Sequence, residues 1–350
     1  MDNVFYMDRS DFAQRLNSVV IPEGITDEER NRSVLHLSEA IVQMMPDSLF
    51  RFRPCDENNP KQLNYNIEAF REDNIYTSTA DKFNDPYDTL VRYDIDSIKG
   101  LVSSLLSSES LHRIKSYFEQ GNNFSDSMIQ VNPDVDFDII KKELLRFDIS
   151  INSERIEEHK KRIISSIDFY YPILAEMNKR FVSIACFCEE IQSIAMWSHY
   201  AHSHQGFALE YNFRKTFEKG ITNCGIFPVN YDDERYDASL LMAISFLRLM
   251  GSHILNPDAM SHIKCSLHKA KLWEYEKEWR LLDYTPRDIF TDSPRATHYC
   301  PTAIYYGAKL PLHIKVQLHE IALHKKVTEY ELYIDYSSPK YEMNYKLYHV

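Results

Sequence analysis

The alternating glutamates of the segment WEYEKEWRLL, residues 273–282, are the side chains best placed for chemistry. If the segment is a strand, Glu276, Glu278 and Arg280 lie on one face, because successive side chains point to opposite sides. Carboxylates that share a face raise one another's pKa unless a cation such as Arg280 compensates. The pattern favours general acid/base catalysis or stabilisation of a developing positive charge. The structural alternative is a solvated strand face with a ladder of charges.

Two arginines near residue 50 are candidates for anion binding. Arg51 and Arg53 alternate with apolar residues in LFRFR, so a strand would place both on the same face. A planar guanidinium group suits bidentate contact with phosphate or carboxylate. The structural alternative pairs both arginines with the glutamates in a salt-bridge network.

A histidine cluster suggests a metal site as a further alternative. His199, His202 and His204 follow one another closely, and Cys186 or Cys188 could join them as ligands. The spacing fits no known zinc pattern, and only His199 and His202 share a helix face. We therefore expect no metal, and a metal-dependent hydrolase that uses this cluster stays an alternative.

The helices and strands expected from the sequence pattern must position these residues. Their order along the chain indicates an α+β protein with a mixed or antiparallel β core. Residues 1–46 form a helical N-terminal extension, with a Thr26–Glu29 capping box. Residues 47–350 form a single α+β domain with a helical insertion at about 97–180. The predicted helices are 27–45, 61–72, 101–118, 136–147, 153–181 and 238–254. The predicted strands are 49–53, 75–79, 182–188, 207–211, 225–231, 279–284, 303–306, 316–323, 330–336 and 342–348.

Composition excludes several classes of function. The 350-residue chain has only 8 glycines and no glycine-rich dinucleotide or phosphate-loop motif. A net charge of −12 disfavours general nucleic-acid binding. No run approaches the roughly 18 apolar residues of a membrane span. The six cysteines form no CxxC pair and no secretory signal is evident, so a cytoplasmic location is expected.

Four segments in order resemble the bacterial domain of unknown function family 2971. They are LFRFRP, IYTSTADKFNDPYD, MWSHYAHSHQGFALEY and KAKLWEYEKEWRLL, and the resemblance extends from about residue 49 to residue 307. Asp88 departs from the pattern, since the family more often has Glu there, and the shorter side chain is expected to loosen contacts made at this position. The family resemblance itself implies no activity.

The same segments are similar to the Arg, Ser-Thr-Ser and Glu-x-Glu signatures of ADP-ribosyltransferases. That resemblance implies a cleft between two small sheets that holds NAD as co-substrate. Arg51 or Arg53 would bind the pyrophosphate and Ser78 would support the acidic residue. Glu278 would hold the ribose hydroxyl and stabilise an oxocarbenium-like transition state, with Glu276 as a second catalytic residue.

The remaining residues implied to bind the cofactor are His199, Arg280, and Trp197 or Tyr200 stacked on nicotinamide. The predicted function is an NAD-dependent ADP-ribosyltransferase-like enzyme or NAD glycohydrolase, in a bacterial conflict or phage-defence setting. Its partners would be a nucleotide ligand and a protein or nucleic-acid acceptor. A non-enzymatic ligand- or protein-binding sensor is the alternative. All of these roles require Arg51 or Arg53, Ser78 and Glu278 to meet in one cleft.

Overall fold

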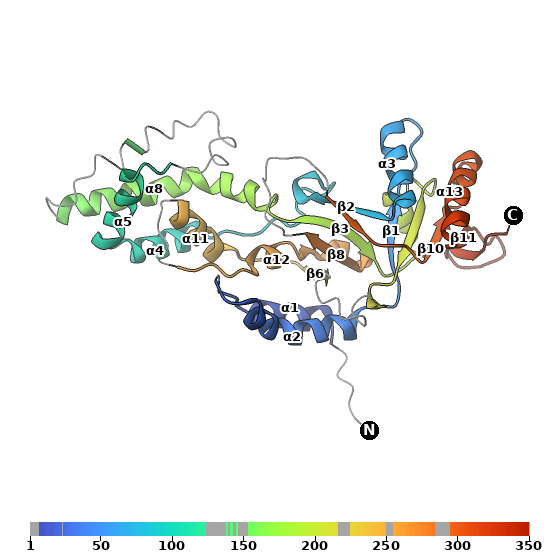
Figure 1. Cartoon of the computed structure of the whole chain (residues 1–350), viewed down its shortest axis with the longest axis horizontal. Helices are drawn as coiled ribbons and strands as arrows, with labels where there is room; N and C mark the ends of the chain where they lie inside the picture. The colour runs from blue at the N-terminus through green and yellow to red at the C-terminus, as the bar shows by residue number, and fades with distance from the viewer. Residues whose placement is uncertain are drawn as a thin grey trace, which may run out of the picture.

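The computed structural model describes residues 7–22, 24–123, 138, 141–142, 145, 153–215, 225–249, 255–283 and 295–349. Within these residues, ten strands form one mixed, mostly antiparallel sheet in which only β10 and β11 pair in parallel (Figure 1). Helices cover the sheet and extend beyond one end of it. The α+β prediction is therefore confirmed.

The sheet follows the order β12-β11-β10-β4-β1-β3-β2-β9, and β8 pairs with both β3 and β5. A separate parallel pair joins β6 to β7. The strands are β1 (Leu49–Arg53), β2 (Asn74–Thr79), β3 (Ser183–Cys188), β4 (Phe207–Tyr211), β5 (Ile226–Pro228), β6 (Asn230–Asp232), β7 (His268–Ala270), β8 (Glu278–Asp283), β9 (Arg295–His298), β10 (Ala303–Tyr306), β11 (Thr328–Tyr333) and β12 (Asn344–Leu347).

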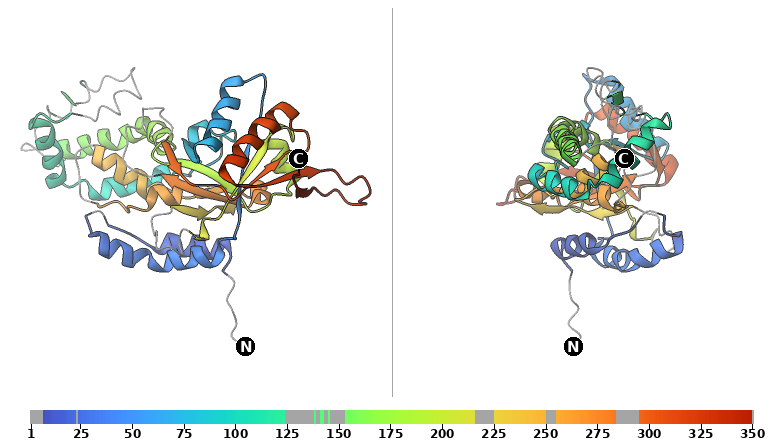
Figure 2. Two further views of the ribbon diagram at one scale, coloured as in Figure 1. Left: turned by 45° about the vertical axis from the view of Figure 1, so that its right-hand side comes forward. Right: turned by 90° about the vertical axis from the view of Figure 1, so that its left-hand side faces the viewer.

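Helices pack around the sheet in two places. Helices α3 (Pro60–Arg71) and α13 (Leu312–Lys325) stand side by side over it, while α1 (Arg9–Ser18) and α2 (Asp27–Met44) form a separate layer below (Figures 1 and 2). The predicted Thr26–Glu29 capping box begins α2. Shorter helices are η1 (Ala80–Lys82), α9 (Ile194–Tyr200), α12 (Ser261–Cys265) and η2 (Lys271–Glu276).

Four helices at one end of the molecule share an apolar cluster of their own. They are α4 (Ile95–Leu105), α5 (Ser108–Glu119), α8 (Ser153–Asn178) and α11 (Ser239–Leu249). The first three fall in the region predicted to be a helical insertion, and α11 joins them from later in the chain. Most of the predicted helix 136–147, residues 250–254 and Tyr284 lie outside the described residues.

One predicted strand is wrong, and part of the segment considered as a strand in the sequence is not extended. Residues 316–323 lie in α13, where Ile314, Leu318 and Ile321 are buried at the three- and four-residue spacing of a helix face. The segment 273–277 is not extended either: it ends the 3₁₀ helix η2, and Lys277 then adopts a left-handed conformation with φ 45°. Only from Glu278 onward does the chain enter a strand. The short strands β7 and β9 were not predicted.

Partly buried His262 is expected to make the stability of the fold depend on pH. Its Nδ1 lies 3.2 Å from Asn178 Oδ1, its ring packs on Phe181, and burial lowers its pKa to about 4. The unfolded chain, with a histidine pKa of about 6.5, therefore binds the proton more readily. The resulting stability is complete above pH 6.5 and is lost as the pH falls toward 4. Between pH 7.5 and 5 we expect wild type to lose about 2 kcal/mol more than His262→Gln in urea unfolding. Identical pH dependences would contradict this burial.

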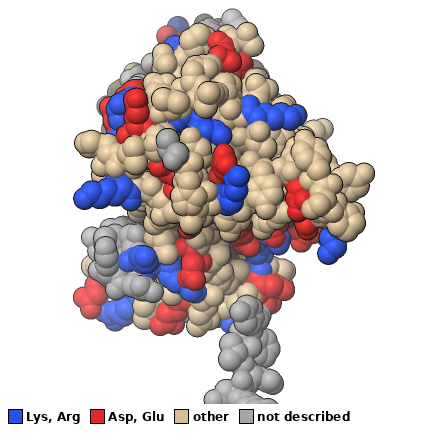
Figure 3. All heavy atoms as spheres, turned by 90° about the vertical axis from the view of Figure 1, so that its right-hand side faces the viewer, with Lys and Arg blue, Asp and Glu red and all other residues tan. Residues whose placement is uncertain are grey.

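No described helix combines the length and the apolar character needed to cross a membrane. On the face shown in Figure 3, acidic and basic side chains are interspersed and form no continuous basic surface.

Candidate functional site

A pocket of about 220 Å³ brings together six of the nine predicted site residues. These are Arg51, Arg53, Ser78, Tyr200, Glu276 and Glu278, from segments more than 200 residues apart. Aromatic side chains also line it: Phe50, Phe52, Phe83 and Phe187. The convergence that the predicted roles require is therefore present, although the roles themselves stay predictions.

The pocket lies where the sheet divides. One edge of β3 pairs along its length with β8, from Ser183 to Cys188. Its other edge is shared: β2 pairs with it at Ser183 and Ile184, and β1 pairs with it at Cys188. The residues between, around Cys186, have neither β1 nor β2 as a ladder partner on that edge. Divergence of β1 from β2 thus opens the sheet at its centre.

Glu276 and Glu278 form one wall of the pocket, and Lys269 of β7 connects them. The Lys269 ammonium group forms an ion pair with Glu276 and lies 3.0 Å from Glu278 Oε2. The Tyr200 hydroxyl donates a 2.7 Å hydrogen bond to Glu276 Oε1. Both carboxylates are 3 % exposed, so the expected solvated charge ladder is wrong.

Arg280 closes the cluster from the protein interior. Its Nε donates to Glu278 Oε1 at 2.8 Å, and one terminal nitrogen contacts both carboxylate oxygens of Asp88 at 2.7 and 2.9 Å. The other terminal nitrogen donates to the Ser266 carbonyl. Arg280 is fully buried and does not line the pocket, so its predicted role in binding the cofactor is wrong. It neutralises and positions the acids instead.

The two glutamates differ in their affinity for a proton. Burial raises the pKa of Glu276 by more than Lys269 lowers it. Burial by itself would also raise the pKa of Glu278. Arg280 and Lys269 together nevertheless hold the pKa of Glu278 well below its usual range. Burial also raises the pKa of Asp88. Three carboxylates therefore share two cations, and the uncompensated charge falls on the pair Asp88 and Glu276.

Arg51 and Arg53 lie on a different face of β1 from the residues in register with the acidic cluster. Phe50 is in register with Cys188, and Cys188 is in register with Glu278, so these three side chains share one face. Arg51 and Arg53 are offset by one and three residues from Phe50 and therefore take the other face. Both arginines nevertheless line the pocket, so they reach it from the face of β1 opposite to that of Phe50.

Neither arginine has an acidic partner among the described residues. Arg51 donates to the Tyr76 carbonyl at 2.7 Å and packs over the Phe187 ring, while Arg53 contacts Asn66 Oδ1 at 3.4 Å. One nitrogen of Arg51 and two of Arg53 are buried without a hydrogen-bond partner. The predicted salt-bridge network with the glutamates is therefore wrong. Burial lowers the pKa of Arg51 to about 9, which leaves it charged at neutral pH.

Two further predictions fail because their side chains lie elsewhere. Trp197 is fully buried, packs edge-on against Phe52 and donates its indole N–H to the Ile191 carbonyl, so it cannot stack on a ligand. His199 is exposed on α9 and does not line the pocket. Tyr200, by contrast, does line it.

The histidine cluster does not form a metal site in the described part of the chain. His202 Nε2 lies 3.7 Å from Asp56, and His204 Nε2 lies 3.2 Å from Ser198 Oγ. Residues 202–204 all have positive φ, which turns the chain tightly into Gly206 and β4. Among the described residues, three potential metal ligands lie close together at a different place, at Asp73, His298 and Cys300. These histidines therefore do not form the set of metal ligands that the alternative function, a metal-dependent hydrolase, would require.

Comparison with known proteins finds a family match for one part of the chain. Residues 196–281 match the family described as protein of unknown function, DUF2971. This confirms the resemblance for the last two of the four segments, whereas LFRFRP and NDPYD lie outside the match. No curated protein and no solved structure matched the chain. The resemblance to ADP-ribosyltransferases therefore has no support from these comparisons.

Sequence reasoning missed two residues of the cluster, Lys269 and Asp88. Lys269 lies in the DUF2971-matched segment and could have been found from its position at the start of the KAKLWEYEKEWR motif. Asp88 was noted only as shorter than the glutamate common in the family. Its side chain nevertheless reaches Arg280 with both oxygens. The predicted loosening of contacts at this position is therefore wrong.

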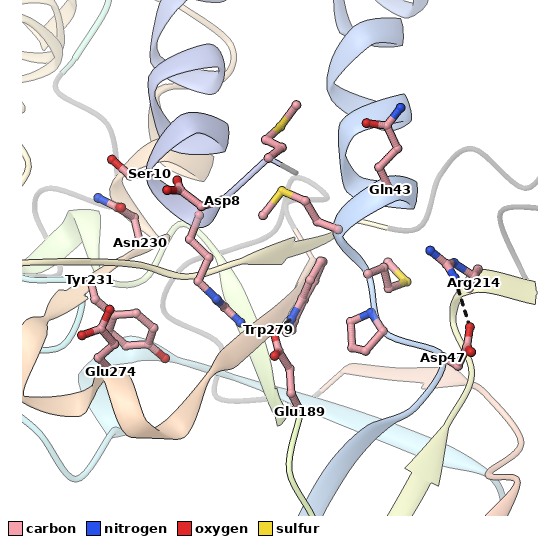
Figure 4. Close-up of a pocket in the computed structure, with 15 residues that line it drawn as sticks. Asp8, Ser10, Gln43, Asp47, Glu189, Arg214, Asn230, Tyr231, Glu274 and Trp279 are labelled. Carbon is pink, nitrogen blue, oxygen red and sulfur yellow. Dashed lines mark hydrogen bonds and ion pairs between the residues drawn. The ribbon is translucent and has the colours of Figure 1, made fainter. Parts of the chain in front are cut away.

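A larger cavity of about 1080 Å³ lies on the other side of β8, between α1, α2 and the β core (Figure 4). None of the nine predicted residues lines it. Trp279 points into this cavity, whereas the neighbouring Glu278 points into the smaller pocket. Arg9 of α1 lines the larger cavity and contacts the backbone of a residue of the smaller pocket. Its guanidinium group donates to the Glu278 carbonyl at 2.7 Å and to Glu189.

Proposed function

We propose that the smaller pocket cleaves the nicotinamide–ribose bond of NAD and passes the ADP-ribose to water or to an acceptor. One observation carries the proposal: two adjacent carboxylates, Glu276 and Glu278, have their pKa values moved in opposite directions in one aromatic-walled pocket. Pairs of this kind assign acid/base roles, because one group exchanges a proton while the other stays charged. The matched family has no described activity, so the proposal rests on this geometry.

The two glutamates would act on the sugar in different ways. When the C–N bond breaks, its electron pair leaves with nicotinamide and positive charge develops on the ribose. Glu278, kept ionised by Arg280 and Lys269, would stabilise that charge. Glu276, the stronger base, would take the proton of the attacking hydroxyl as the new C–O bond forms. Tyr200 would orient Glu276 through its hydrogen bond.

The size of the pocket limits how much of NAD enters. Its volume of about 220 Å³ is below the roughly 300–1,000 Å³ of pockets that enclose drug-sized ligands. Only the nicotinamide–ribose end would therefore enter, past Ser78, and the diphosphate would lie at the opening. Arg51 and Arg53, which line the pocket, would attract the diphosphate through the positive potential that they create.

Nicotinamide release from NAD, measured by chromatography, tests the proposal. We expect wild type to release nicotinamide and both Glu278→Gln and Glu276→Gln to lose about 10²–10³-fold in rate. Glu274→Gln is the matched control, since Glu274 is an exposed glutamate outside this pocket. Full activity of both pocket variants would place the chemistry elsewhere. No release by folded wild type, with or without cell extract as a source of acceptor, would reject the enzyme.

A second function, ligand sensing without turnover, is favoured by the contacts of Glu278. Arg280 holds one of its oxygens, Lys269 and Arg280 hold the other, and the residue is almost completely buried. A carboxylate with both oxygens occupied suits a fixed recognition element. This function predicts saturable NAD binding without nicotinamide release, weakened to a similar extent by Arg51→Ala and Glu278→Gln. The proposed setting for either function is bacterial conflict or phage defence in the cytoplasm.

A further inference from the structure

Three potential metal ligands meet at the edge of the sheet, away from the glutamate pocket. They are Asp73, His298 and Cys300, whose ligand atoms all lie within 4.8 Å of one another. His298 ends the edge strand β9, and Cys300 follows two residues later. Asp73 immediately precedes β2, the strand that pairs with β9. Two neighbouring strands therefore deliver the three side chains to one point.

The backbone holds Asp73 opposite the other two residues. Asn74 is in register with His298, and the Tyr299 N–H donates to the Asp73 carbonyl at 2.9 Å. Asp73 also has φ 58°, a left-handed conformation that most residues avoid. This turn brings the start of β2 beside the 298–300 segment. The arrangement is thus fixed by main-chain contacts and does not depend on the side chains being attracted to one another.

The spacing of the ligand atoms suits a tetrahedral ion. Cys300 Sγ lies 3.4 Å from Asp73 Oδ2. Two ligands of one tetrahedral zinc, with Zn–S of about 2.3 Å and Zn–O of about 2.0–2.2 Å, would be about 3.5 Å apart. The second oxygen of Asp73 is buried and has no hydrogen-bond partner in the part of the chain that the structure describes. His298 and Cys300 are exposed, so an ion from solvent can reach them and water can complete the coordination.

We propose that Asp73, His298 and Cys300 bind a zinc ion through one oxygen, one nitrogen and one sulfur atom, with water as the fourth ligand. A mixed N/S/O set with an open position is typical of zinc sites that keep a water. On binding, the Cys300 thiol loses its proton to solvent and the thiolate forms the bond to the metal. The site is independent of the function proposed for Glu276 and Glu278.

Lys325 competes with the ion for Asp73. Its ammonium group lies 2.8 Å from Asp73 Oδ2, the same oxygen that faces Cys300. Because like charges repel, zinc binding must move Lys325 away from this carboxylate. Removing the ammonium group should therefore strengthen zinc binding, whereas removing a ligand should weaken it. These opposite signs distinguish a coordinated ion from general attraction to an acidic chain.

The test measures zinc affinity of the chelator-treated full chain by competition with a chromophoric chelator, together with metal content by mass spectrometry. We expect one zinc per wild-type chain, at least tenfold weaker binding for Cys300→Ser and for His298→Ala, and severalfold tighter binding for Lys325→Met. His313→Ala is the matched control and should bind like wild type, because this exposed histidine pairs with Glu57 and belongs to no group of three close ligands among the described residues. Zinc should also slow alkylation of Cys300 at least tenfold.

Three results would overturn the site: no stoichiometric zinc on wild type, equal binding by wild type and Cys300→Ser, or weaker binding by Lys325→Met. Cys300 is exposed, and serine has nearly the same shape, so the thiol substitution should leave the fold intact. A melting curve of each variant without zinc confirms this before affinities are compared.

Discussion

Replacing Arg280 with methionine is expected to lower the free energy of unfolding by about 3–5 kcal/mol. Arg280 is fully buried and supplies charge to Asp88 and Glu278, which are also buried. Its removal leaves three carboxylates, including Glu276, with Lys269 as their only cation in the cluster. Buried charge without compensation is among the largest single-residue penalties in proteins. Urea unfolding followed by circular dichroism at neutral pH gives the difference directly.

The control for this prediction is Arg32→Ala, which removes an exposed arginine paired with Glu28 across one helical turn. Exposed pairs of this kind contribute little, so the change should be within about 0.5 kcal/mol. Adding Asp88→Asn to Arg280→Met should recover part of the loss, because it removes one uncompensated charge. A loss below about 1 kcal/mol for Arg280→Met would mean that water or a rearranged Lys269 already neutralises the cluster.

Replacing Arg53 with methionine is expected to have the opposite effect and to raise the free energy of unfolding by about 1–3 kcal/mol. Arg53 is also buried, yet among the described residues its side chain makes one hydrogen bond, of 3.4 Å to Asn66, and two of its nitrogens have no hydrogen-bond partner there. Methionine fills a similar volume without a buried charge. The same urea experiment measures the change.

Retention of a destabilising arginine would indicate a function, since binding sites often keep groups that reduce stability. In the proposed function, Arg53→Met would therefore also weaken NAD binding. If the substitution destabilises the chain by more than about 1 kcal/mol, Arg53 has a structural partner, such as an ordered water, and its assignment to ligand binding loses its basis.

Much of the fold could be predicted from local pattern. Strands at 49–53, 207–211 and 303–306 have the predicted bounds because β-branched and aromatic residues lie between clear turn signals. The prediction of a strand at 316–323 is wrong because β-branched Val316 and the apolar residues after it fit both the two-residue period of a strand and the 3.6-residue period of a helix. The tertiary contacts of Ile314, Leu318 and Ile321 select the helix.

The site was predicted less completely, because its electrostatics depend on contacts between distant segments. The alternation of side-chain direction along a strand correctly placed Glu278 and Arg280 on one face of β8. It could not show that Lys269 returns to join Glu276 and Glu278, because that contact requires the 3₁₀ turn at 271–276. Strand periodicity placed Arg51 and Arg53 together but could not say which face of the sheet they share. That face depends on the register of β1 with β3.

The most direct test of the central claim is a carbon-13 NMR titration of glutamate side-chain carboxyls in the intact chain. Glu276→Gln and Glu278→Gln identify the two resonances by their loss. The signal of Glu276 should titrate above the usual glutamate value of about 4.3, and that of Glu278 should stay ionised well below it. Ordinary titration of both carboxyls, or the reverse order, would remove the division of roles on which the proposed chemistry depends.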